Sequence, residues 1–281
     1  MQLAVTALSV FARKNPLGLV GLVILALVCI AALAAPWIAP YGPLELGDSP
    51  LAGPSAKHLA GTDQFGRDIL SRVIFGARIS LLIALVVISL GGVVATVIGM
   101  ATTYVGGPVE YVWQRFVDAV MALPSLVLLL GILSVVERSI LSVIVILSLR
   151  FAITNTRYIR AVTLGALASD YVTSARVIGA SPARTLFRHI LPNILSLIIV
   201  LLSYEVGTVI LIEASLSFLG YGVPPPDPTW GSMLARDGRT YMIVAPWMLI
   251  APAVALSLVV FAVNVVGDGV RDMLDPRLRG L

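Results

Sequence analysis

The sequence predicts an all-α integral membrane protein with six transmembrane helices. Of its 281 residues, 58% are hydrophobic and 12% are charged, whereas a soluble domain is about half apolar and about a quarter charged. This excess of apolar surface is more than one protein core can bury, so lipid must cover the remainder. A membrane-spanning helix needs about 20 mostly apolar residues, and six segments meet this condition: 17–38, 79–104, 116–136, 139–156, 193–213 and 243–266.

The first of these segments also fits a signal peptide, because it follows Arg13 and Lys14 and ends in the small residues "ALAA" at 32–35. Its uninterrupted apolar run is longer than the roughly 7–15 residues of a signal-peptide core, so we expect a retained helix. The expected organisation is an N-terminal segment at 1–16, a transmembrane domain at 17–266 with loops at about 39–78, 157–192 and 214–242, and a tail at 267–281.

The distribution of lysine and arginine predicts the orientation. If the N-terminus is cytoplasmic, six spans return the C-terminus to the cytoplasm, and eleven Lys and Arg residues then lie inside against seven outside. Cytoplasmic loops of membrane proteins carry such an excess. We therefore expect both termini, and the loop at 157–192, on the cytoplasmic side.

That loop contains the polar stretch "TSARVIGASPARTLFRHILPN" at 173–193. Its pattern predicts a short helix from Tyr171 that stops at Gly179, since glycine readily adopts the left-handed conformation that ends a helix. A second helix is expected to begin at Pro182 with Ser181 as its cap, and to end where the next span starts, at Leu191–Pro192. A short exposed helix with small side chains and flanking arginines suits docking into a groove of another protein. The alternative is contact with anionic lipid.

The same stretch resembles the EAA loop of the permease subunits of ABC importers. Alignment on Gly179 places Thr173, Ser174 and Ala175 at the E-A-A positions and Leu191-Pro192 at the distal L-P pair. Two positions depart from the pattern, because Thr173 replaces the glutamate and His189 stands where the family has isoleucine.

Three further stretches resemble the second permease subunit of the dipeptide, oligopeptide and nickel importers, a subunit similar to dipeptide permease C. They are "GTDQFGRDILSR" at 61–72 with "GARISL" at 76–81, "LSFLGYGVPPPDPTWG" at 216–231, and "GDGVRDMLDPRLR" at 267–279. From the residues we expect the first to form an amphipathic helix on the outer surface, with an Asp68–Arg72 pair. The second is expected to form a rigid outer loop, with Trp230 at the membrane–water boundary.

The resemblance implies the type I permease fold of ABC importers, and it implies partners. These are a second permease subunit, two cytoplasmic ABC ATPase subunits or a fused ATPase, and an extracytoplasmic substrate-binding protein, all at the bacterial plasma (inner) membrane. No nucleic-acid partner is expected. The implied cargo is di- or oligopeptides, with nickel or another metal chelate as the alternative. Candidate ATPase-coupling residues are Tyr171, Thr173, Ser174, Ala175, Arg176, Gly179 and Ala180; candidate residues for docking the binding protein are Asp63, Arg67, Asp68, Pro225 and Trp230.

The sequence excludes ATP hydrolysis by this chain. A P-loop needs lysine followed by serine or threonine, but the two lysines, Lys14 and Lys57, are followed by Asn15 and His58. ATP and Mg²⁺ would therefore bind to partner ATPases, and we expect no cofactor in this chain. With Cys29 as the only cysteine, the sequence offers no disulfide or cysteine-based metal site.

Three ionisable residues fall within the expected spans and are candidates for the translocation pathway: Arg150, Glu205 and Glu213. A charge near the centre of a span costs roughly 2.5–3.5 kcal/mol, so such residues face the bundle interior, an aqueous cavity or a membrane surface. Glu205 and Glu213 could instead serve a proton-coupled secondary transporter, or could bond to Arg150 or Asn264. An intramembrane protease is disfavoured because neither His58 nor His189 lies in a span.

Overall fold

Long apolar helices make up most of the protein. The computed structural model describes residues 15–47 and 49–274, and among these residues five helices are long and apolar enough to cross a membrane, or six if one bent pair counts as a single span. The spanning helices are α2 (Pro16–Leu33), α4 (Ile69–Val105), α7 (Ile140–Leu167), α10 (Leu191–Phe218) and α13 (Trp247–Leu274), and the bent pair is α5 (Gly107–Ala122) with α6 (Ser125–Leu133). The predicted all-helical membrane architecture is confirmed, and its six spans are reached when the bent pair is counted as one span.

Short helices connect these spans. They are α3 (Ala35–Ile38), α8 (Asp170–Val177), α9 (Pro182–Arg184), the π-helical segment η1 (Thr185–Ile190), α11 (Trp230–Leu234) and α12 (Arg236–Thr240). The expected short helix between the fourth and fifth spans is therefore present, as α8.

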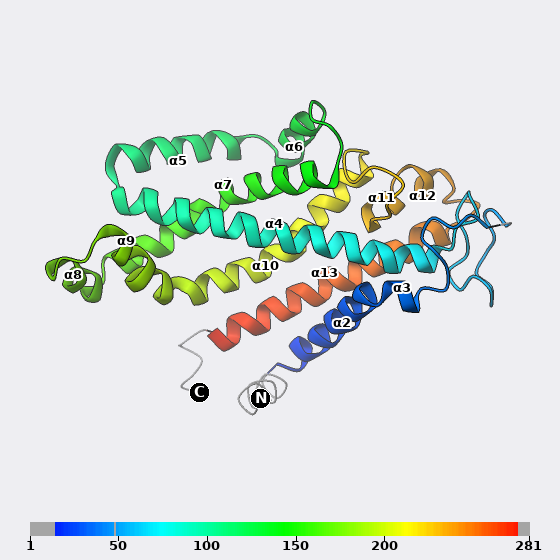
Figure 1. Ribbon diagram of the computed structural model, residues 1–281, viewed down its shortest axis with the longest axis horizontal. Helices are drawn as coiled ribbons and strands as arrows, with labels where there is room; N and C mark the ends of the chain where they lie inside the picture. The colour runs from blue at the N-terminus through cyan, green and yellow to red at the C-terminus, as the bar shows by residue number, and fades with distance from the viewer. Residues whose placement is uncertain (1–14, 48, 275–281) are drawn as a thin grey trace.

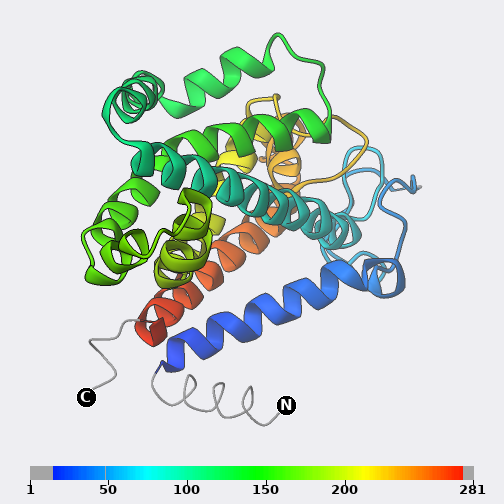
Figure 2. The same ribbon diagram turned by 60° about the vertical axis from the view of Figure 1, so that its left-hand side comes forward.

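The long helices lie side by side, so the bundle has two distinct ends (Figures 1 and 2). One end carries α8, together with the start of α2 and the end of α13, and we call it the α8 end. There, Asn15 donates a hydrogen bond to Asp272 at 3.3 Å. The opposite end carries α11, α12 and the segment 39–68, and we call it the α11 end (Figure 1).

Helix starts are fixed by side-chain caps that the sequence encodes. Asn15 accepts a hydrogen bond from the Gly18 backbone N–H at 2.9 Å, directly before the proline that opens α2. Asp68 caps α4 and Ser139 caps α7 in the same way. Each cap satisfies one of the backbone donors that a helix start leaves without an intrahelical partner.

A stripe of small residues brings α4 and α7 together. Gly91, Ala95 and Gly99 lie on one face of α4 and are all buried. A Cβ atom added at Gly91 would lie 2.9 Å from the carbonyl oxygen of Ser148, and one added at Gly99 would lie 2.8 Å from Ile159. The backbones therefore approach too closely for larger side chains, as expected where small residues recur every fourth position in membrane helices.

The third span, expected at 116–136, is interrupted at Pro124. It consists of α5 and α6, which meet at an angle of 90°. Pro124 lies at the break, where it precedes the first residue of α6. A proline in a helix interior removes a backbone donor and clashes with the preceding turn, so the sequence marks the place of the break but not its direction.

Several helices extend beyond the apolar segments that predicted them. α4 begins at Ile69, so the helix expected to lie on the outer surface is the first part of the spanning helix itself. α7 continues to Leu167, which places Arg157 and Arg160 on a helix rather than in the expected loop at 157–192. α13 continues to Leu274, into the expected tail. The segment 1–14 and the rest of the tail lie outside the described residues.

Candidate functional site

The helix α8 projects from the α8 end between the two long elements α7 and η1–α10 (Figure 1). One face packs inward, because Val172 and Ala175 are buried. The tip is exposed: the side chains of Val177 and Ile178 are 80% and 82% accessible. This pattern produces a small amphipathic knob with two apolar residues at its outer end.

Gly179 ends α8 in the predicted way. Its φ of +81° lies in the left-handed region, and the Ala180 N–H donates to the Ala175 carbonyl while the Gly179 N–H donates to the Arg176 carbonyl, both at 3.0 Å. These two bonds form a Schellman motif, which satisfies carbonyls that the helix end would leave open. The motif turns the chain sharply toward α9.

The structure separates the seven candidate coupling residues into two groups. Most of the set lies on the accessible surface of α8 and its C-terminal turn: Tyr171, Thr173, Ser174, Arg176 and Gly179 are exposed, and Ala180 is half-buried. Ala175 is only 3% exposed, so it supports the knob from inside and is not available for an outward contact. Arg176 lies over the ring of Tyr104, 4.9 Å from its centre, and so connects α8 to the end of α4.

Sequence reasoning missed Val177 and Ile178, which are the most exposed apolar residues of this region. The available signal was a pair of large apolar residues directly before a helix-ending glycine. At that position the chain reverses, so their side chains have no neighbouring turn to cover them.

The helix after α8 is continuous into the fifth span, whereas a break was expected at Pro192. α9 leads through the π-helical segment η1 into α10, and Pro192 lies in the first turn of α10. Proline lacks a backbone donor and its ring crowds the carbonyl four residues earlier. A π-helical turn widens the backbone at that point, and the helix continues past this proline into α10.

A polar pocket lies beside the break between α5 and α6, between α7 and α10. We call it the central pocket. Its volume is about 580 Å³, within the roughly 300–1,000 Å³ of sites that hold small molecules. It is lined by Val120, Met121, Ala122, Leu123, Pro124, Ser125, Leu128, Arg150, Thr154, Asn155, Glu205 and Thr208.

Two of the three candidate pathway residues meet in the central pocket. Arg150 comes from α7 and Glu205 from α10, and each is half-buried. Their opposite charges attract one another across the pocket. The expectation that Arg150 avoids the lipid by facing the inside of the bundle agrees with this placement.

Glu213 does not line the central pocket. It lies farther along α10 toward the α11 end, is 1% exposed, and accepts a hydrogen bond from Ser217 at 2.7 Å. Eight residues of helix separate two positions by about 12 Å, so Glu205 and Glu213 occupy different surroundings. Glu213 is part of the packing of α10 against the segment around Trp230.

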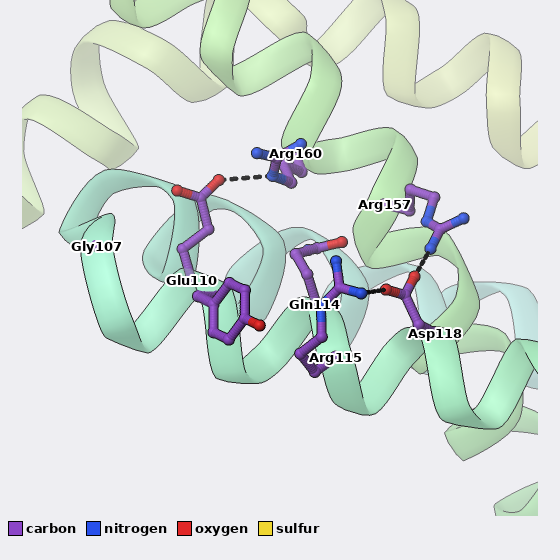
Figure 3. A pocket seen from close by; sticks show the side chains of 8 residues that line it. Gly107, Glu110, Gln114, Arg115, Asp118, Arg157 and Arg160 are labelled. Atoms are coloured by element: carbon purple, nitrogen blue, oxygen red, sulfur yellow. Dashed lines mark hydrogen bonds and ion pairs between the residues drawn. The ribbon is translucent and has the colours of Figure 1, made fainter.

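A second pocket, of about 490 Å³, lies between α5 and α7 near the α8 end (Figure 3). We call it the α5–α7 ion-pair pocket. Arg160 donates to Glu110 at 2.5 Å, Arg157 donates to Asp118, and Arg115 lies 3.0 Å from Asp118. The pairs made by Arg160 and Arg157 fasten α5 to α7, whereas Arg115 and Asp118 both lie on α5. Sequence reasoning did not identify the two pairs between helices because their partners are far apart along the chain.

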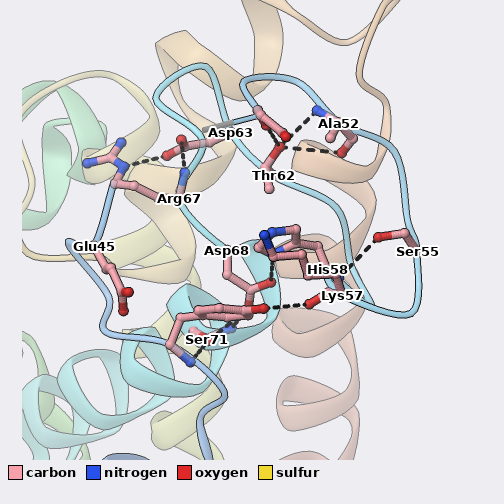
Figure 4. Close-up of polar contacts among 12 residues, drawn as sticks. Glu45, Ala52, Ser55, Lys57, His58, Thr62, Asp63, Arg67, Asp68 and Ser71 are labelled. Atoms are coloured by element: carbon pink, nitrogen blue, oxygen red, sulfur yellow. Dashed lines mark hydrogen bonds and ion pairs between the residues drawn. The ribbon is translucent and has the colours of Figure 1, made fainter. Parts of the chain in front are cut away.

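Polar residues of the segment 39–68 form a buried network at the α11 end (Figure 4). Asp63 accepts from the backbone N–H groups of Phe65 and Arg67, at 2.8 and 2.9 Å, and from the Arg67 side chain at 2.6 Å. Asp68 pairs with His58 at 2.9 Å and accepts from Ser71 at 2.8 Å. These bonds hold an irregular segment in place over the start of α4.

This network corrects the expected roles of the outer motifs. Asp63 and Asp68 are 3% and 2% exposed and the Arg67 side chain is largely buried, so these residues stabilise the segment instead of presenting a docking surface. Asp68 pairs with His58 rather than with Arg72, which lies 3.8 Å from Asp63.

Trp230 and Pro225 have opposite environments. Trp230 is 1% exposed, and its indole N–H donates to the Val73 carbonyl at 3.0 Å. It is therefore a core residue and not the expected membrane-boundary anchor. Pro225 is exposed, so it stays a candidate for docking. Exposed neighbours at this end that the sequence did not single out are Leu59 and Phe65.

Comparison with known families identifies the class of protein. Residues 88–280 match the family described as binding-protein-dependent transport system inner membrane component. The chain belongs to this family. Residues 6–54 match a second model, the N-terminal TM domain of oligopeptide transport permease C. The inner-membrane-component match covers α8 and the central pocket, whereas the buried network is centred between the two matched regions.

Individual relatives match over nearly the whole chain. A peptide transport system permease protein of Brucella suis, provisionally named, is 40% identical over 264 residues, covering 92% of this chain and 88% of the relative. The dipeptide transport system permease protein DppC of Haemophilus influenzae is 35% identical over 274 residues, with 95% and 92% covered. The glutathione transport system permease protein GsiD of Escherichia coli is 37% identical over 270 residues, with 95% and 89% covered.

Membership of this family makes the protein a multi-pass membrane permease component of a transport system. The central pocket is thus a candidate part of a transport path, and α8 is a candidate contact for other subunits. The sequence resemblance to a dipeptide permease C-like subunit is confirmed by the matched families and relatives.

Proposed function

We propose that this chain is one of two membrane subunits of an ATP-driven importer of short peptides. Three relatives with similar full-length sequences are named for the transport of peptides, dipeptides and glutathione. Because the chain has no P-loop, the ATP would be hydrolysed by partner ATPases. A second permease would complete the path, and a substrate-binding protein would deliver the peptide from outside.

The observation that carries this proposal is the exposed tip of α8. Val177 and Ile178 are apolar and almost fully accessible at the end of a helix whose opposite face is buried. An apolar tip of this kind is suited to insertion into a groove of another protein. We infer that the groove belongs to the ATPase, and that the exposed residues of α8 form the contact.

The proposed contact fixes the orientation of the molecule. If α8 faces the cytoplasm, then the start of α2 and the end of α13 lie on the same side, because all three share one end of the bundle (Figure 1). This agrees with cytoplasmic termini and with the excess of Lys and Arg in the expected inner loops. The segment 39–68 and the exposed Pro225 then face the outside, where a binding protein would dock.

The mechanism we infer is alternating access. α8 lies between α7 and the helix that leads into α10, and both α7 and α10 line the central pocket. Closure of the ATPases would push on α8 and shift these two helices, which would open the pocket outward to accept peptide. Relaxation of the nucleotide sites would reverse the shift and release peptide inward.

Other cargo and energy sources fit the molecule less well. Across residues 15–47 and 49–274, no group of three or more His, Cys, Asp or Glu side chains is placed to hold a metal ion, so bare-metal binding has no support in that part of the chain. A proton-coupled mechanism based on Glu205 and Glu213 is also disfavoured, because the two carboxylates occupy separate environments.

Reconstitution tests the proposal. The chain is purified with its co-expressed permease and ATPase partners, placed in liposomes, and supplied with binding protein and labelled peptide. We expect uptake that requires ATP and survives a protonophore. Uptake that needs a proton gradient and proceeds without the ATPase chains would contradict the proposal.

A further inference from the structure

The central pocket is lined by two side chains of opposite charge that do not form an ion pair with each other. Arg150 and Glu205 both line it, and among the described residues no ion pair within 4.0 Å connects the guanidinium to the carboxylate. Charged groups within spans are costly and usually serve a function. Because the two groups do not neutralise each other by contact, each can still bond to a molecule in the pocket.

The broken third span adds a second positive feature. α6 begins at Ser125, which lines the pocket, and no side chain caps this helix start. Its first backbone N–H groups lack intrahelical partners, and the helix dipole makes this end positive. Half-helices of broken spans are known to present such ends to anionic groups of substrates. Here the start of α6 reinforces the charge of Arg150.

The rest of the pocket is a mixture of neutral polar and apolar groups. Thr154 and Asn155 already donate to carbonyls of their own helix, at 3.0 and 3.1 Å, so their remaining oxygen lone pairs are acceptors for a ligand. Val120, Met121 and Leu128 supply an apolar wall. Such a wall tolerates different side chains, whereas the charged groups demand fixed charges in the ligand.

We propose that the central pocket recognises a short peptide by its two charged ends. Glu205 receives the terminal ammonium group, while Arg150 and the first turn of α6 receive the terminal carboxylate. This inference rests on the proposed function, and it adds that the permease itself selects for free peptide ends, independently of the binding protein. A peptide with a blocked N-terminus lacks the ammonium group that Glu205 would bind, and a peptide with a blocked C-terminus lacks the carboxylate that Arg150 would bind.

The rival explanation is a structural pair that merely compensates two charges. The two explanations differ in the double variant R150Q/E205Q. A structural pair is damaged most by single neutralisation, which leaves one charge uncompensated, and is largely restored when both are removed. If both residues bind the ligand, the double variant takes up unmodified peptide more slowly than either single variant.

The first experiment pairs variants with modified peptides in the reconstituted complex. Uptake of trialanine, N-acetyl-trialanine and trialanine amide is measured for wild type, E205Q and R150Q, and each variant is compared with wild type for the same peptide. Any preference of the binding protein among the three peptides affects variant and wild type equally, so it cancels in this comparison. We expect E205Q to slow the uptake of trialanine about tenfold but that of N-acetyl-trialanine less than twofold. We expect R150Q to slow the uptake of trialanine about tenfold but that of trialanine amide less than twofold. The exposed carboxylate of Glu137 offers a matched control, E137Q, with equal uptake throughout.

The second experiment measures occupancy without the binding protein. Thr208 lines the pocket, so T208C in a C29S background places a single reporter cysteine in this chain. Trialanine should protect it from maleimide labelling in the purified complex, and cyclic dialanine, which has no charged ends, should not. Protection should need about tenfold more trialanine in E205Q.

The outcomes separate this inference from the proposed function. Suppose that wild type imports trialanine but that each variant slows the uptake of all three peptides by the same factor, or that the double variant recovers uptake. In either case the inference of end recognition is wrong, while the proposed function as a peptide importer stands. If cyclic dialanine protects as well as trialanine, the inference is also wrong. If wild type imports no peptide with ATP, the proposed function fails and the inference fails with it.

Discussion

Arg160 of α7 donates a hydrogen bond to Glu110 of α5 across 2.5 Å, and Arg157 pairs with Asp118 farther along the same two helices (Figure 3). α7 leads directly into α8, and the far end of α5 lines the central pocket. These ion pairs therefore join α7, the helix that leads into α8, to α5, whose far end lines the central pocket.

Removal of this connection should uncouple ATP hydrolysis from transport. Both side chains of the Arg160–Glu110 pair are partly exposed, so the pair itself contributes only about 0–1 kcal/mol to stability. We expect E110Q to leave the melting temperature nearly unchanged while the number of peptides imported per ATP falls about threefold or more. The exchanged pair, E110R with R160E, should recover part of the loss. Equal losses of hydrolysis and uptake would argue against a coupling role.

Replacement of Gly179 should block transport without unfolding the chain. Its φ of +81° costs an ordinary residue about 1–2 kcal/mol, although an added Cβ would meet no atom within 4 Å. We expect G179V to abolish uptake while the protein remains in the membrane. Asparagine adopts left-handed conformations more readily, so G179N should keep most of the activity. Normal transport by G179V would contradict a role for the shape of this turn.

The small-residue stripe of α4 should be sensitive to single methyl groups. The Cβ of G91A would lie 2.9 Å from the Ser148 carbonyl oxygen, a backbone atom that cannot move independently of α7. Overpacking of this kind costs about 1–3 kcal/mol, which should appear as a lower melting temperature in detergent. Gly165 of α7 has open space around it, so G165A is the matched control and should be neutral or slightly stabilising. Equal melting temperatures for the two variants would show that the helices do not pack as described.

Asp63 should act on stability rather than on binding-protein affinity. The variant D63A leaves the largely buried Arg67 without its carboxylate partner, and loss of one member of a buried pair costs about 3–5 kcal/mol. We expect less folded complex, with unchanged affinity of the folded fraction for the binding protein. A selective loss of affinity at normal stability would restore the docking role that the sequence suggested.

The sequence predicts the spans and the end of α8 because each depends on local chemistry. Apolar runs and Gly179 act within one or two helical turns. The angle at Pro124 is not predictable in this way, because it depends on how α5 and α6 pack against α7. The predicted spans are shorter than the observed helices for a similar reason. Hydropathy marks only the part of a helix that lipid covers, and α4 begins before that part, at Ile69.

The outer motif shows why site prediction failed where it did. Charged residues in a loop were assumed to face solvent, yet Asp63, Arg67 and Asp68 find partners and turn inward. Glu110, the partner of Arg160, and Glu205, which lines the central pocket with Arg150, likewise come from other helices. A contact between distant segments leaves no spacing signal in a single sequence, so only the fold reveals it.

The central claim is that the tip of α8 contacts an ATPase, and a cross-link from Ile178 tests it most directly. A photoreactive residue is placed at position 178 of the full complex in membranes, with position 137 as an exposed control at a different place in the fold. We predict that illumination joins position 178 to an ATP-binding chain, with a yield that changes when ATP is added, and that position 137 gives no such product. Cross-linking of position 178 to lipid alone, in a complex that still imports peptide with ATP, would contradict the account.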